Sequence, residues 1–322
     1  MISIFAPVRS SINGFDNLRG FLKSFVENSS DFKNFELIFK LDNDDQELNK
    51  IIEILEEHKK KGLSIKHIVT SSSDGYRSLK YFLMDLVLES NINTSLYWAL
   101  PDDVRITQKD WDEKVLKCAN EHHSNMFVIH THRVDDLKNM DIHQAIQECE
   151  GFPIISKEWL NTQQGHFSFT GHVDSWTSAT ELLLYKKYKI DHRVELIPHI
   201  LKRIITEDTD GVGSKRWNTV RREMLTSVLK KKSYEMLESN VDNIYMKIMN
   251  EKGIKSYNDK MNEEKLDSHN NYLINMMLNS YDKYLIERQK NENIGKKNIL
   301  QRVVNFSYSV AKKVAKKISS TI

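Results

Sequence analysis

The chain has few cysteines and no long hydrophobic segment, and both absences exclude classes of protein. Cys118 and Cys149 are the only cysteines among 322 residues and form no CxxC motif, so we expect two reduced thiols rather than a disulfide. No stretch approaches the roughly 20 apolar residues of a transmembrane helix. The first nine residues, MISIFAPVR, contain too short an apolar run for a secretory signal. These features predict a cytoplasmic protein.

The chain also lacks a strong excess of charge of either sign. Its formal net charge is +2, which is too close to neutral to indicate a nucleic-acid partner. A length of 322 residues is sufficient for one large domain with a sizeable core, alone or with a smaller domain. Composition therefore narrows the class of protein but leaves its function to the motifs.

Short apolar runs alternate with amphipathic segments over the first 132 residues. The runs predict strands at 2–7, 35–45, 63–71, 95–100 and 125–132, and the segments between them predict helices at 15–28, 46–62 and 76–91. This alternation predicts a mostly parallel sheet with right-handed crossovers. In sheets of this kind, ligands bind outside the carboxyl ends of the strands.

Polar clusters follow four of the predicted strands, at residues 7–9, 42–45, 71–76 and 102–103. Because the carboxyl ends of parallel strands meet at one edge of a sheet, we expect these clusters to lie together. Asp102 and Asp103 raise a question of their own, since adjacent carboxylates repel unless they are solvated, protonated or close to a positive charge. By itself, the sequence Pro-Asp-Asp is typical of the start of a helix.

Five stretches follow one another in a characteristic order: ISIFAPVRSSINGFDNLRGFLKSF, FELIFKLDNDDQE, GYRSLKYFLMDLVLESN, LYWALPDDVRITQKDWDEKV and GHVDSWTSATELLLYKKYKIDHRVE. This ordered set resembles the nucleotide-sugar glycosyltransferases of the GT-A fold, most closely those of the family 2 type. The resemblance implies an α/β fold, with a Rossmann-like, mostly parallel sheet flanked by helices and an α-helical C-terminal extension. It implies a GT-A catalytic domain at 1–205, a helical extension at 206–295 and a basic amphipathic tail at 296–322.

For the acidic pair, the resemblance implies a divalent metal site of the DxD type. The diphosphate of a nucleotide-diphospho-sugar must be neutralised, and a hard cation such as Mn²⁺ or Mg²⁺ does this while bound to carboxylate oxygens. In this alignment Asp103 binds the metal, and Asp102 faces the ribose or the waters of the metal. Some members of the family complete the metal site with a histidine that follows the catalytic base, here Asp174, in the sequence. His192 and His199 are the candidates here, and we choose His199.

The resemblance also implies donor contacts at the other strand ends. Asp42 corresponds to a carboxylate that binds the base or the ribose, and Pro7 and Arg9 lie where a nucleotide contact is expected. Tyr76 precedes a helix, where members of the family often hold the nucleotide or its diphosphate. The alternatives are a surface position for Arg9, ordinary packing for Tyr76, and, for the acids after Asp42, negative charge at the N-terminus of the next helix.

Asp174 lies just before a helical pattern and corresponds to the general base of inverting members of the family. There, a carboxylate deprotonates the acceptor hydroxyl as its oxygen attacks the anomeric carbon from the face opposite the diphosphate. A plain helix N-cap is the alternative, and it is compatible with the role of base. Trp159 and Trp176 are predicted either to stack on sugar rings or to belong to the core.

Two later segments are polar or basic. Residues 205–218 contain the only Gly-x-Gly of the chain and are predicted to form a loop. This loop either closes over the diphosphate, with Lys215 or Arg216 countering its charge, or links to the helical region. Residues 296–322 carry seven basic residues and no acidic one. This tail is predicted either to meet an anionic membrane surface as an amphipathic helix or to dock on the protein.

The leading hypothesis is an inverting, metal-dependent glycosyltransferase of the hexosyltransferase type, with a nucleotide-diphospho-sugar donor and a saccharide or lipid-linked acceptor. The resemblance and the basic tail imply surface polysaccharide or glycoconjugate biosynthesis, in the cytoplasm or peripherally on the inner membrane face. One rival is a sugar-nucleotide nucleotidyltransferase, which is disfavoured because the segment after the first strand contains little glycine. The other rival is a non-catalytic scaffold of the same fold, which is disfavoured because the acidic pair and Asp174 are all present.

Overall fold

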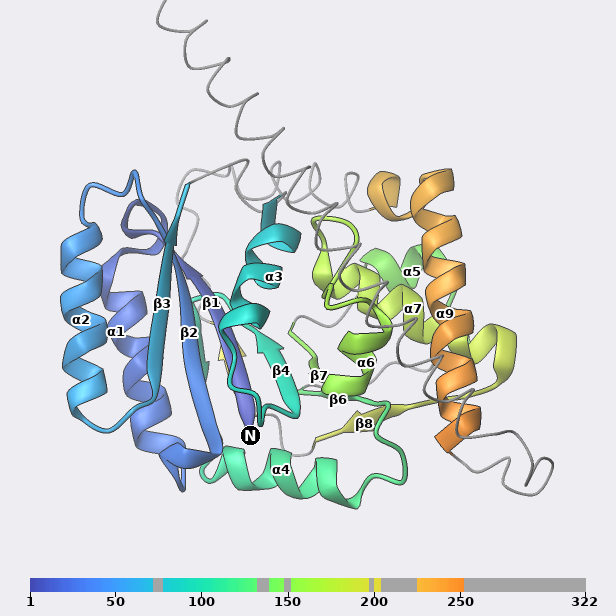
Figure 1. Ribbon diagram of the computed structural model, residues 1–322, viewed down its shortest axis with the longest axis horizontal. Coiled ribbons are helices and arrows are strands. Elements are labelled where there is room, and N and C mark those ends of the chain that lie inside the picture. The colour runs from blue at the N-terminus through green and yellow to red at the C-terminus, as the bar shows by residue number, and fades with distance from the viewer. Residues whose placement is uncertain (72–77, 132–138, 148–151, 197–199, 204–224, 252–322) are drawn as a thin grey trace, which may run out of the picture. The chain divides into compact units, whose positions relative to one another are not determined.

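A seven-stranded, mostly parallel sheet organises the part of the chain that the structure describes, which comprises residues 1–71, 78–131, 139–147, 152–196, 200–203 and 225–251 (Figure 1). The strands of this computed structural model, in spatial order, are β3 (Ile65–Thr70), β2 (Phe35–Asp42), β1 (Ile2–Val8), β4 (Leu96–Ala99), β7 (Ile154–Ser156), β6 (Val128–His130) and β8 (Arg193–Glu195). Strands β1 to β4 are parallel, β7 is antiparallel to both of its neighbours, and β6 and β8 again run in the direction of β4. The carboxyl ends of β1, β2, β3 and β4 therefore meet at one edge of the sheet, which we call the rim.

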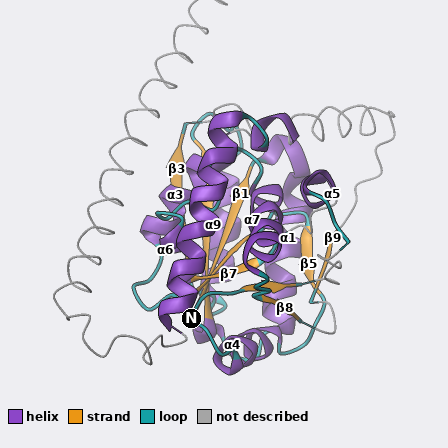
Figure 2. Ribbon diagram, turned by 90° about the vertical axis from the view of Figure 1, so that its right-hand side faces the viewer, coloured by secondary structure: helices purple, strands orange, loops and turns teal. Residues whose placement is uncertain are grey.

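Helices cover both faces of this sheet. One layer contains α1 (Ser10–Asn28), α2 (Leu48–Lys60) and α4 (Trp111–Glu121), and the other contains α3 (Leu79–Glu89), α6 (Lys157–Thr162), α7 (Val173–Tyr188) and α9 (Lys231–Glu251). The short helix α5 (Ile142–Gln147) packs on α7. Figures 1 and 2 both show α4 at the end of the sheet where β1 begins, which is the edge opposite the rim. The predicted α/β architecture, a mostly parallel sheet flanked by helices, is confirmed.

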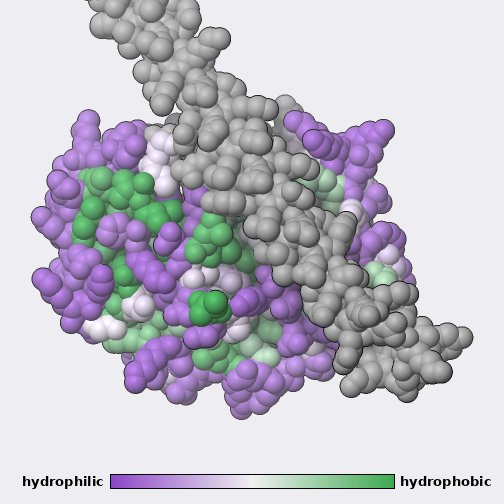
Figure 3. All heavy atoms as spheres, in the orientation of Figure 1, coloured by the Kyte–Doolittle hydropathy of each residue, from purple (hydrophilic) through white to green (hydrophobic). Residues whose placement is uncertain are grey.

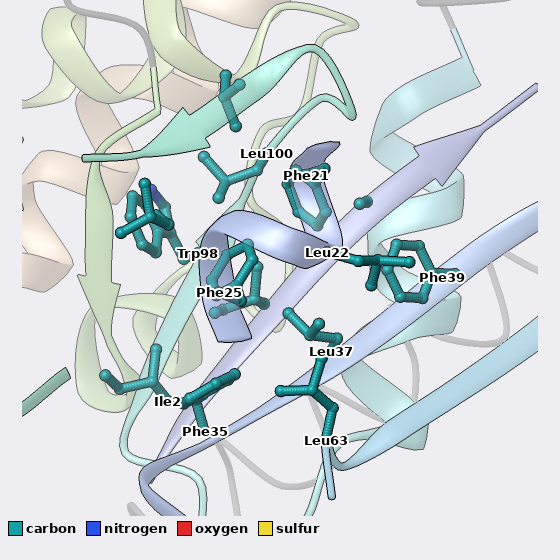
Figure 4. Packing of buried hydrophobic residues seen from close by; sticks show 14 of the residues in the cluster. Ile2, Phe21, Leu22, Phe25, Phe35, Leu37, Phe39, Leu63, Trp98 and Leu100 are labelled. Atoms are coloured by element: carbon teal, nitrogen blue, oxygen red, sulfur yellow. The ribbon is translucent and has the colours of Figure 1, made fainter. Parts of the chain in front are cut away.

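Alternation of side chains along the strands explains why the sheet needs two helical layers. Successive residues of a strand point to opposite faces, and every residue of β2 is buried. In the layer of α1, the ring of Phe21 lies edge-on to that of Phe39, with centroids 6.1 Å apart, and Phe25 contacts Phe35 at 5.6 Å. Figure 4 shows these α1 side chains directed at the strands. The continuous apolar run of β2 is thus the sequence pattern of a strand covered on both sides.

Helix α9 packs into the hydrophobic core on the side of the sheet that α6 and α7 cover. Its residues Val241, Ile244 and Ile248 are fully buried in the core cluster that also contains side chains of α6 and α7. Tyr245 stacks on Tyr188 of α7, with ring centroids 3.8 Å apart. The helical C-terminal extension is therefore confirmed over residues 231–251, whereas the domain boundaries at 205 and 295 lie outside the described residues. Among those residues, no helix has the length and apolarity needed to cross a membrane.

The surface over β3 and α3 carries hydrophobic side chains between hydrophilic ones (Figure 3). Val69 of β3 is 44% exposed, and Leu88 of α3 is 58% exposed. Strand β3 ends the sheet on this side, so its outer backbone groups are not paired within the sheet. Lys66 bridges the two elements, because its ammonium group donates to the carbonyl oxygen of Glu89 at 2.9 Å.

Two segments differ from the sequence prediction. The residues after the acidic pair do not begin a helix: Val104–Ile106 forms the strand β5, which pairs antiparallel with β9 (Leu201–Arg203), and α4 starts only at Trp111. Residues 154–156, where no strand was predicted, form strand β7 between β4 and β6. Both strands are three residues long and take partners distant in the sequence, so no local periodicity reveals them.

A buried carboxylate fixes the edge of the sheet opposite the rim. Asp112 of α4 is 0% exposed and accepts hydrogen bonds from the backbone N–H groups of Ser30 and Asp31, at 2.8 and 3.1 Å. The Ser30 hydroxyl and the Asn34 side-chain amide also donate to it, both at 2.8 Å. Burial raises the pKa of Asp112, but these hydrogen bonds outweigh burial and hold the pKa below its ordinary value. Asp112 thus ties α4 to the connection between α1 and β2.

We expect Asp112→Asn to lower the free energy of unfolding at neutral pH by on the order of 2 kcal/mol, because buried donors lose a charged acceptor. A lowered folded-state pKa means that the carboxylate stabilises the fold above its unfolded pKa of about 3.9, and that this contribution is lost as the pH falls through the folded value. Urea unfolding at several pH values measures both effects. Glu113→Gln, at the exposed neighbouring position, is the control and should change little. A difference between wild type and Asp112→Asn that does not shrink on acidification would contradict this account.

Candidate functional site

The rim brings together predicted site residues from three adjacent strands. Pro7 and Arg9 lie at the end of β1, and Asp42 is the last residue of β2. Asp102 and Asp103 follow β4. Because β1 lies between β2 and β4 and is parallel to both, these three strand ends are neighbours. The expected convergence of polar clusters is therefore confirmed for β1, β2 and β4.

Ion pairs join the ends of β1 and β2. Nη1 of Arg9 lies 2.7 Å from Oδ2 of Asp42 and 3.1 Å from Oδ1 of Asp44. The ammonium group of Lys40 pairs with the other oxygen of Asp42 and lies 3.8 Å from the ring centroid of Phe82. Lys40 and Asp42 are both buried, whereas Asp44 is exposed. Asp42 therefore has a structural role, as the counter-ion of a buried lysine, whatever else it binds.

Asp45 organises the N-terminus of α1. Its carboxylate accepts the backbone N–H of Ser10 at 2.7 Å, the Ser10 hydroxyl at 2.5 Å and the backbone N–H of Glu47 at 3.0 Å. Burial raises the pKa of Asp45, but the hydrogen bonds and the charge of Arg9 prevail and lower the pKa. The alternative given for this acid was negative charge at the start of the following helix, α2, and its bond to Glu47 lies there. The bonds to Ser10 show that Asp45 also holds the first turn of α1, which comes earlier in the chain.

A guanidinium group accompanies the acidic pair. Asp102 is 3% exposed and Asp103 is half-buried. Nη1 of Arg105, on β5, donates to the carbonyl oxygens of Asp102 and Val104 at 3.3 and 2.8 Å. Burial lowers the pKa of Arg105, and the charges of Asp102 and Asp103 partly offset this effect. Strand β5 therefore places a positive charge near the two carboxylates, and the hydrogen bonds of Nη1 go to backbone carbonyl oxygens.

Gly20 of α1 makes room for this arginine. A side chain at Gly20 would place its Cβ atom 2.4 Å from Nη2 of Arg105, far inside van der Waals contact. The same guanidinium group donates to Oδ1 of Asn17 at 3.3 Å, one turn earlier on the helix. Helix α1 therefore leaves space for Arg105 at Gly20 and accepts a hydrogen bond from it at Asn17.

Asp174 is connected to the end of β4 through Phe152. The backbone N–H of Phe152 donates to Oδ1 of Asp174 at 3.2 Å, and its carbonyl oxygen accepts Nε1–H of Trp98 at 2.7 Å. Phe152 has a φ of 70°, a left-handed conformation that is uncommon for residues other than glycine. Trp98 lies on β4, four residues before Asp102. These contacts link the predicted base to the strand that carries the predicted metal ligands.

The position of Asp174 within α7 also differs from the N-cap alternative. The N-cap residue is His172, so Asp174 lies inside the first turn of the helix. A carboxylate in that turn is favoured by the helix dipole in its charged form. Two turns further along α7, Glu181 pairs with Nε2 of His130 at 2.7 Å, and both side chains are buried. His130 ends β6, so this pair adds a second polar link between α7 and the sheet.

The remaining predicted residues are divided between the core, the opposite edge and the segments that the structure does not describe. Trp159 and Trp176 are 0% exposed, so they belong to the core and do not stack on sugars. His192 precedes β8 and lies at the amino end of that strand, away from the rim. Tyr76, His199, the loop at 205–218 and the tail at 296–322 lie outside the described residues.

Lys40 and Arg105 were not among the residues predicted for the site. Lys40 is a charged residue within the otherwise apolar run of β2, FELIFKLD, and a buried lysine needs a counter-ion. Arg105 follows the acidic pair at a spacing of two, which is informative only once residues 104–106 are known to form a strand. The sequence therefore contained a signal for Lys40, whereas Arg105 could be recognised only from the tertiary structure.

The donor set at the end of β4 fits a hard divalent cation. Asp102 and Asp103 offer carboxylate oxygens, the ligands that Mg²⁺ and Mn²⁺ prefer. Asp103 is the more accessible of the two. Two carboxylates supply only part of the ligands of such an ion, which would take its others from phosphate and water.

Removing Asp42 should destabilise the fold independently of any ligand. We expect Asp42→Ala to cost on the order of 3 kcal/mol in the free energy of unfolding, because buried Lys40 loses its carboxylate. Asp44→Ala is the matched control. It removes the second, exposed partner of Arg9 and should cost less than about 1 kcal/mol. Denaturant unfolding of both variants measures the difference, and equal costs would contradict the structural role of Asp42.

Comparison with known proteins gives weak likenesses in structure only. No protein-family model matches the sequence, and no curated protein matches it either. Among solved structures, S. aureus TarS 1–349 in complex with UDP-GlcNAc is 12% identical, with 76% of this chain and 72% of that chain covered and a TM-score of 0.46. The mannosyltransferase PcManGT from Pyrobaculum calidifontis, in complex with GDP-Man and Mn²⁺, is 11% identical over 88% of this chain and 84% of that one, with a TM-score of 0.47.

A third structure is of another kind. The 4-diphosphocytidyl-2C-methyl-D-erythritol synthase from Anaerococcus prevotii DSM 20548 is 11% identical, with 68% of this chain and 98% of that chain covered and a TM-score of 0.38. At such low identities a likeness concerns the fold alone, and the function is argued from the site. The site consists of two carboxylates after β4, an ion-paired Asp42 on β2, and Asp174 joined to β4 through Phe152.

Proposed function

We propose that the chain is an inverting, metal-dependent glycosyltransferase that takes its sugar from a nucleotide-diphospho-sugar. The observation that carries this proposal is the connection from Asp174 through Phe152 and Trp98 to the strand that ends in Asp102 and Asp103. It supports a base and a diphosphate site at the same edge of the sheet. In open α/β sheets, this edge is where ligands bind.

The donor is proposed to lie along the rim, across the ends of β2, β1 and β4. Asp103 would hold Mn²⁺ or Mg²⁺, with Asp102 directed to the ribose or to the waters of the ion. When bound, such an ion neutralises the diphosphate and makes it a better leaving group. Asp42 is proposed for the base or ribose, and Arg9, already within reach of two carboxylates, for the phosphates. Pro7 and Tyr76 are proposed to contact the nucleotide or its diphosphate. His199 is proposed to complete the metal site.

The reaction is a displacement at the anomeric carbon. The acceptor oxygen forms a bond to this carbon while the bond from the carbon to the diphosphate oxygen breaks, so that the configuration inverts. The proton of the acceptor hydroxyl passes to the Asp174 carboxylate as the new bond forms. Residence in the first turn of α7 favours the ionised carboxylate that a base requires. The Phe152 N–H bond to one oxygen of Asp174 orients the group.

The acceptor is proposed to be a hydroxyl of a saccharide or of a lipid-linked saccharide, and the sugar a hexose. The proposed setting is the assembly of surface polysaccharide or glycoconjugate. These finer assignments follow from the resemblance to family 2 glycosyltransferases and from the basic sequence at 296–322.

Metal-dependent nucleotide binding is the first test. We expect Mn²⁺ together with one of UDP, GDP or CDP to raise the melting temperature of the full chain, because a ligand that binds only the folded state stabilises it. Asp103→Ala should abolish the shift while keeping the melting temperature without ligand close to that of the wild type. Glu113→Ala, an exposed carboxylate substitution on α4, is the control and should retain the shift. The absence of a metal-dependent shift with any nucleoside diphosphate would overturn the proposal.

Asp174→Asn separates binding from chemistry. It keeps the size and the acceptor oxygen that Phe152 uses but cannot accept a proton, so we expect an unchanged nucleotide-induced melting shift. Transfer of labelled sugar, screened with mixed saccharide acceptors, should fall by roughly 100-fold or more. Loss of the melting shift would assign Asp174 a structural role, and unchanged transfer would exclude it as the base.

A further inference from the structure

Three histidines gather at the edge of the sheet opposite the rim. His122 and His123 directly follow α4, and His192 directly precedes β8. The chain then enters β6 a few residues after His123, and β6 and β8 are parallel neighbours. The three side chains therefore lie at the amino ends of these two strands, whereas Asp102 and Asp103 lie at a carboxyl end. This cluster is separate from the proposed donor site.

The imidazoles are close enough to share one ion. One nitrogen from each of the three rings lies within 4.8 Å of the other two. Ring centroids are 4.4 Å apart for His122 and His123, 5.7 Å for His122 and His192, and 5.6 Å for His123 and His192. His192 is buried, His122 is half-buried and His123 is exposed, so the cluster opens to solvent on one side. Among the described residues, this is the one group of three or more histidine, cysteine or acidic side chains with such spacing.

Backbone groups orient two of the rings. Nδ1 of His192 lies 2.7 Å from the carbonyl oxygen of Met126, which can only accept, so Nδ1 carries the proton and Nε2 is left as the electron-pair donor. Nδ1 of His122 lies 2.9 Å from the carbonyl oxygen of Ser124, and it accepts the backbone N–H of the same residue at 3.2 Å, so Ser124 holds this ring in either tautomer. Histidines that bind metals usually donate their other ring N–H in this way, because it fixes the ring and raises its basicity.

We propose that His122, His123 and His192 form a binding site for a transition-metal ion, with Zn²⁺ as the best match. Imidazole nitrogen suits Zn²⁺, Cu²⁺ and Ni²⁺, whereas Mg²⁺ and Mn²⁺ prefer oxygen ligands. Three protein ligands leave one position of a tetrahedral ion to water or to a small anion. The site therefore differs in metal class from the carboxylate pair at the rim, and the proposal is independent of the glycosyltransferase proposal.

Such an ion would tie two distant segments of the chain together. The ligands connect the end of α4 to the start of β8, which lie some seventy residues apart in sequence. Ser124, next to His123, also donates its hydroxyl to Glu251 at the end of α9, at 2.5 Å, and Asn125 N–H donates to the same carboxylate oxygen at 3.0 Å. Metal binding at the histidines should therefore stabilise the junction of α4, β6, β8 and α9.

The test uses the untagged full chain, titrated with Zn²⁺ against a chromophoric chelator. We expect one equivalent of Zn²⁺ to bind and to raise the melting temperature, with no such effect from Mg²⁺. His123→Gln should weaken Zn²⁺ binding by roughly tenfold or more and remove the melting shift. Because His123 is exposed, this variant should fold, as an unchanged melting temperature without metal will show. His143→Gln, another exposed histidine, is the control and should behave like the wild type.

Two further measurements keep the two metal sites distinct. The Asp103→Ala chain should retain Zn²⁺ binding in full, since its substitution lies at the rim. Co²⁺ in place of Zn²⁺ should give the visible absorption bands of a tetrahedral ion in the wild type and lose them in His123→Gln. The proposal is overturned if Zn²⁺ binds wild type and His123→Gln equally, or if Asp103→Ala removes the Zn²⁺ that His123→Gln retains.

Discussion

Parallel pairing of β1 with both β2 and β4 is the constraint on which the rest of the structure depends. It brings residues from positions 7–9, 42–45 and 102–103 to one edge of the sheet, although they are far apart in the sequence. It equally sends the starts of the strands to the other edge, where Asp112 joins α4 to the turn after α1. Helices cover both faces of the sheet and exclude ligands from them, so binding is confined to the two edges where the strands end.

Charge balance determines how the acids at the rim are tolerated. Asp42 lies between Lys40 and Arg9, Asp45 accepts the first N–H of α1, and Arg105 lies close to the acidic pair. These contacts offset part of the negative charge at the rim and hold Asp42 and Asp45 in place. An anionic donor then needs an added cation to approach such an edge, which is the physical reason for coupling metal binding to nucleotide binding.

The sequence predicted the fold well because the strands and helices of the first hundred residues are long and periodic. It failed where structure depends on distant partners: residues 104–106 form a strand only because 201–203 pair with them. The same holds for Asp174, whose link to β4 passes through Phe152, and for the histidine cluster, which unites residues 122 and 192. Trp159 and Trp176 had no sequence signal that separates core packing from sugar stacking, and burial decides for the core.

The central claim is that a metal–nucleotide complex binds at the carboxyl ends of β1, β2 and β4. Amide hydrogen exchange of the full chain, with and without Mn²⁺ and each nucleoside diphosphate, tests it most directly. The account predicts slower exchange for backbone amides at residues 9–10, 43–47 and 102–106, and unchanged exchange at residues 30–34 on the opposite edge. Protection confined to that opposite edge, or no protection with any nucleotide, would contradict it.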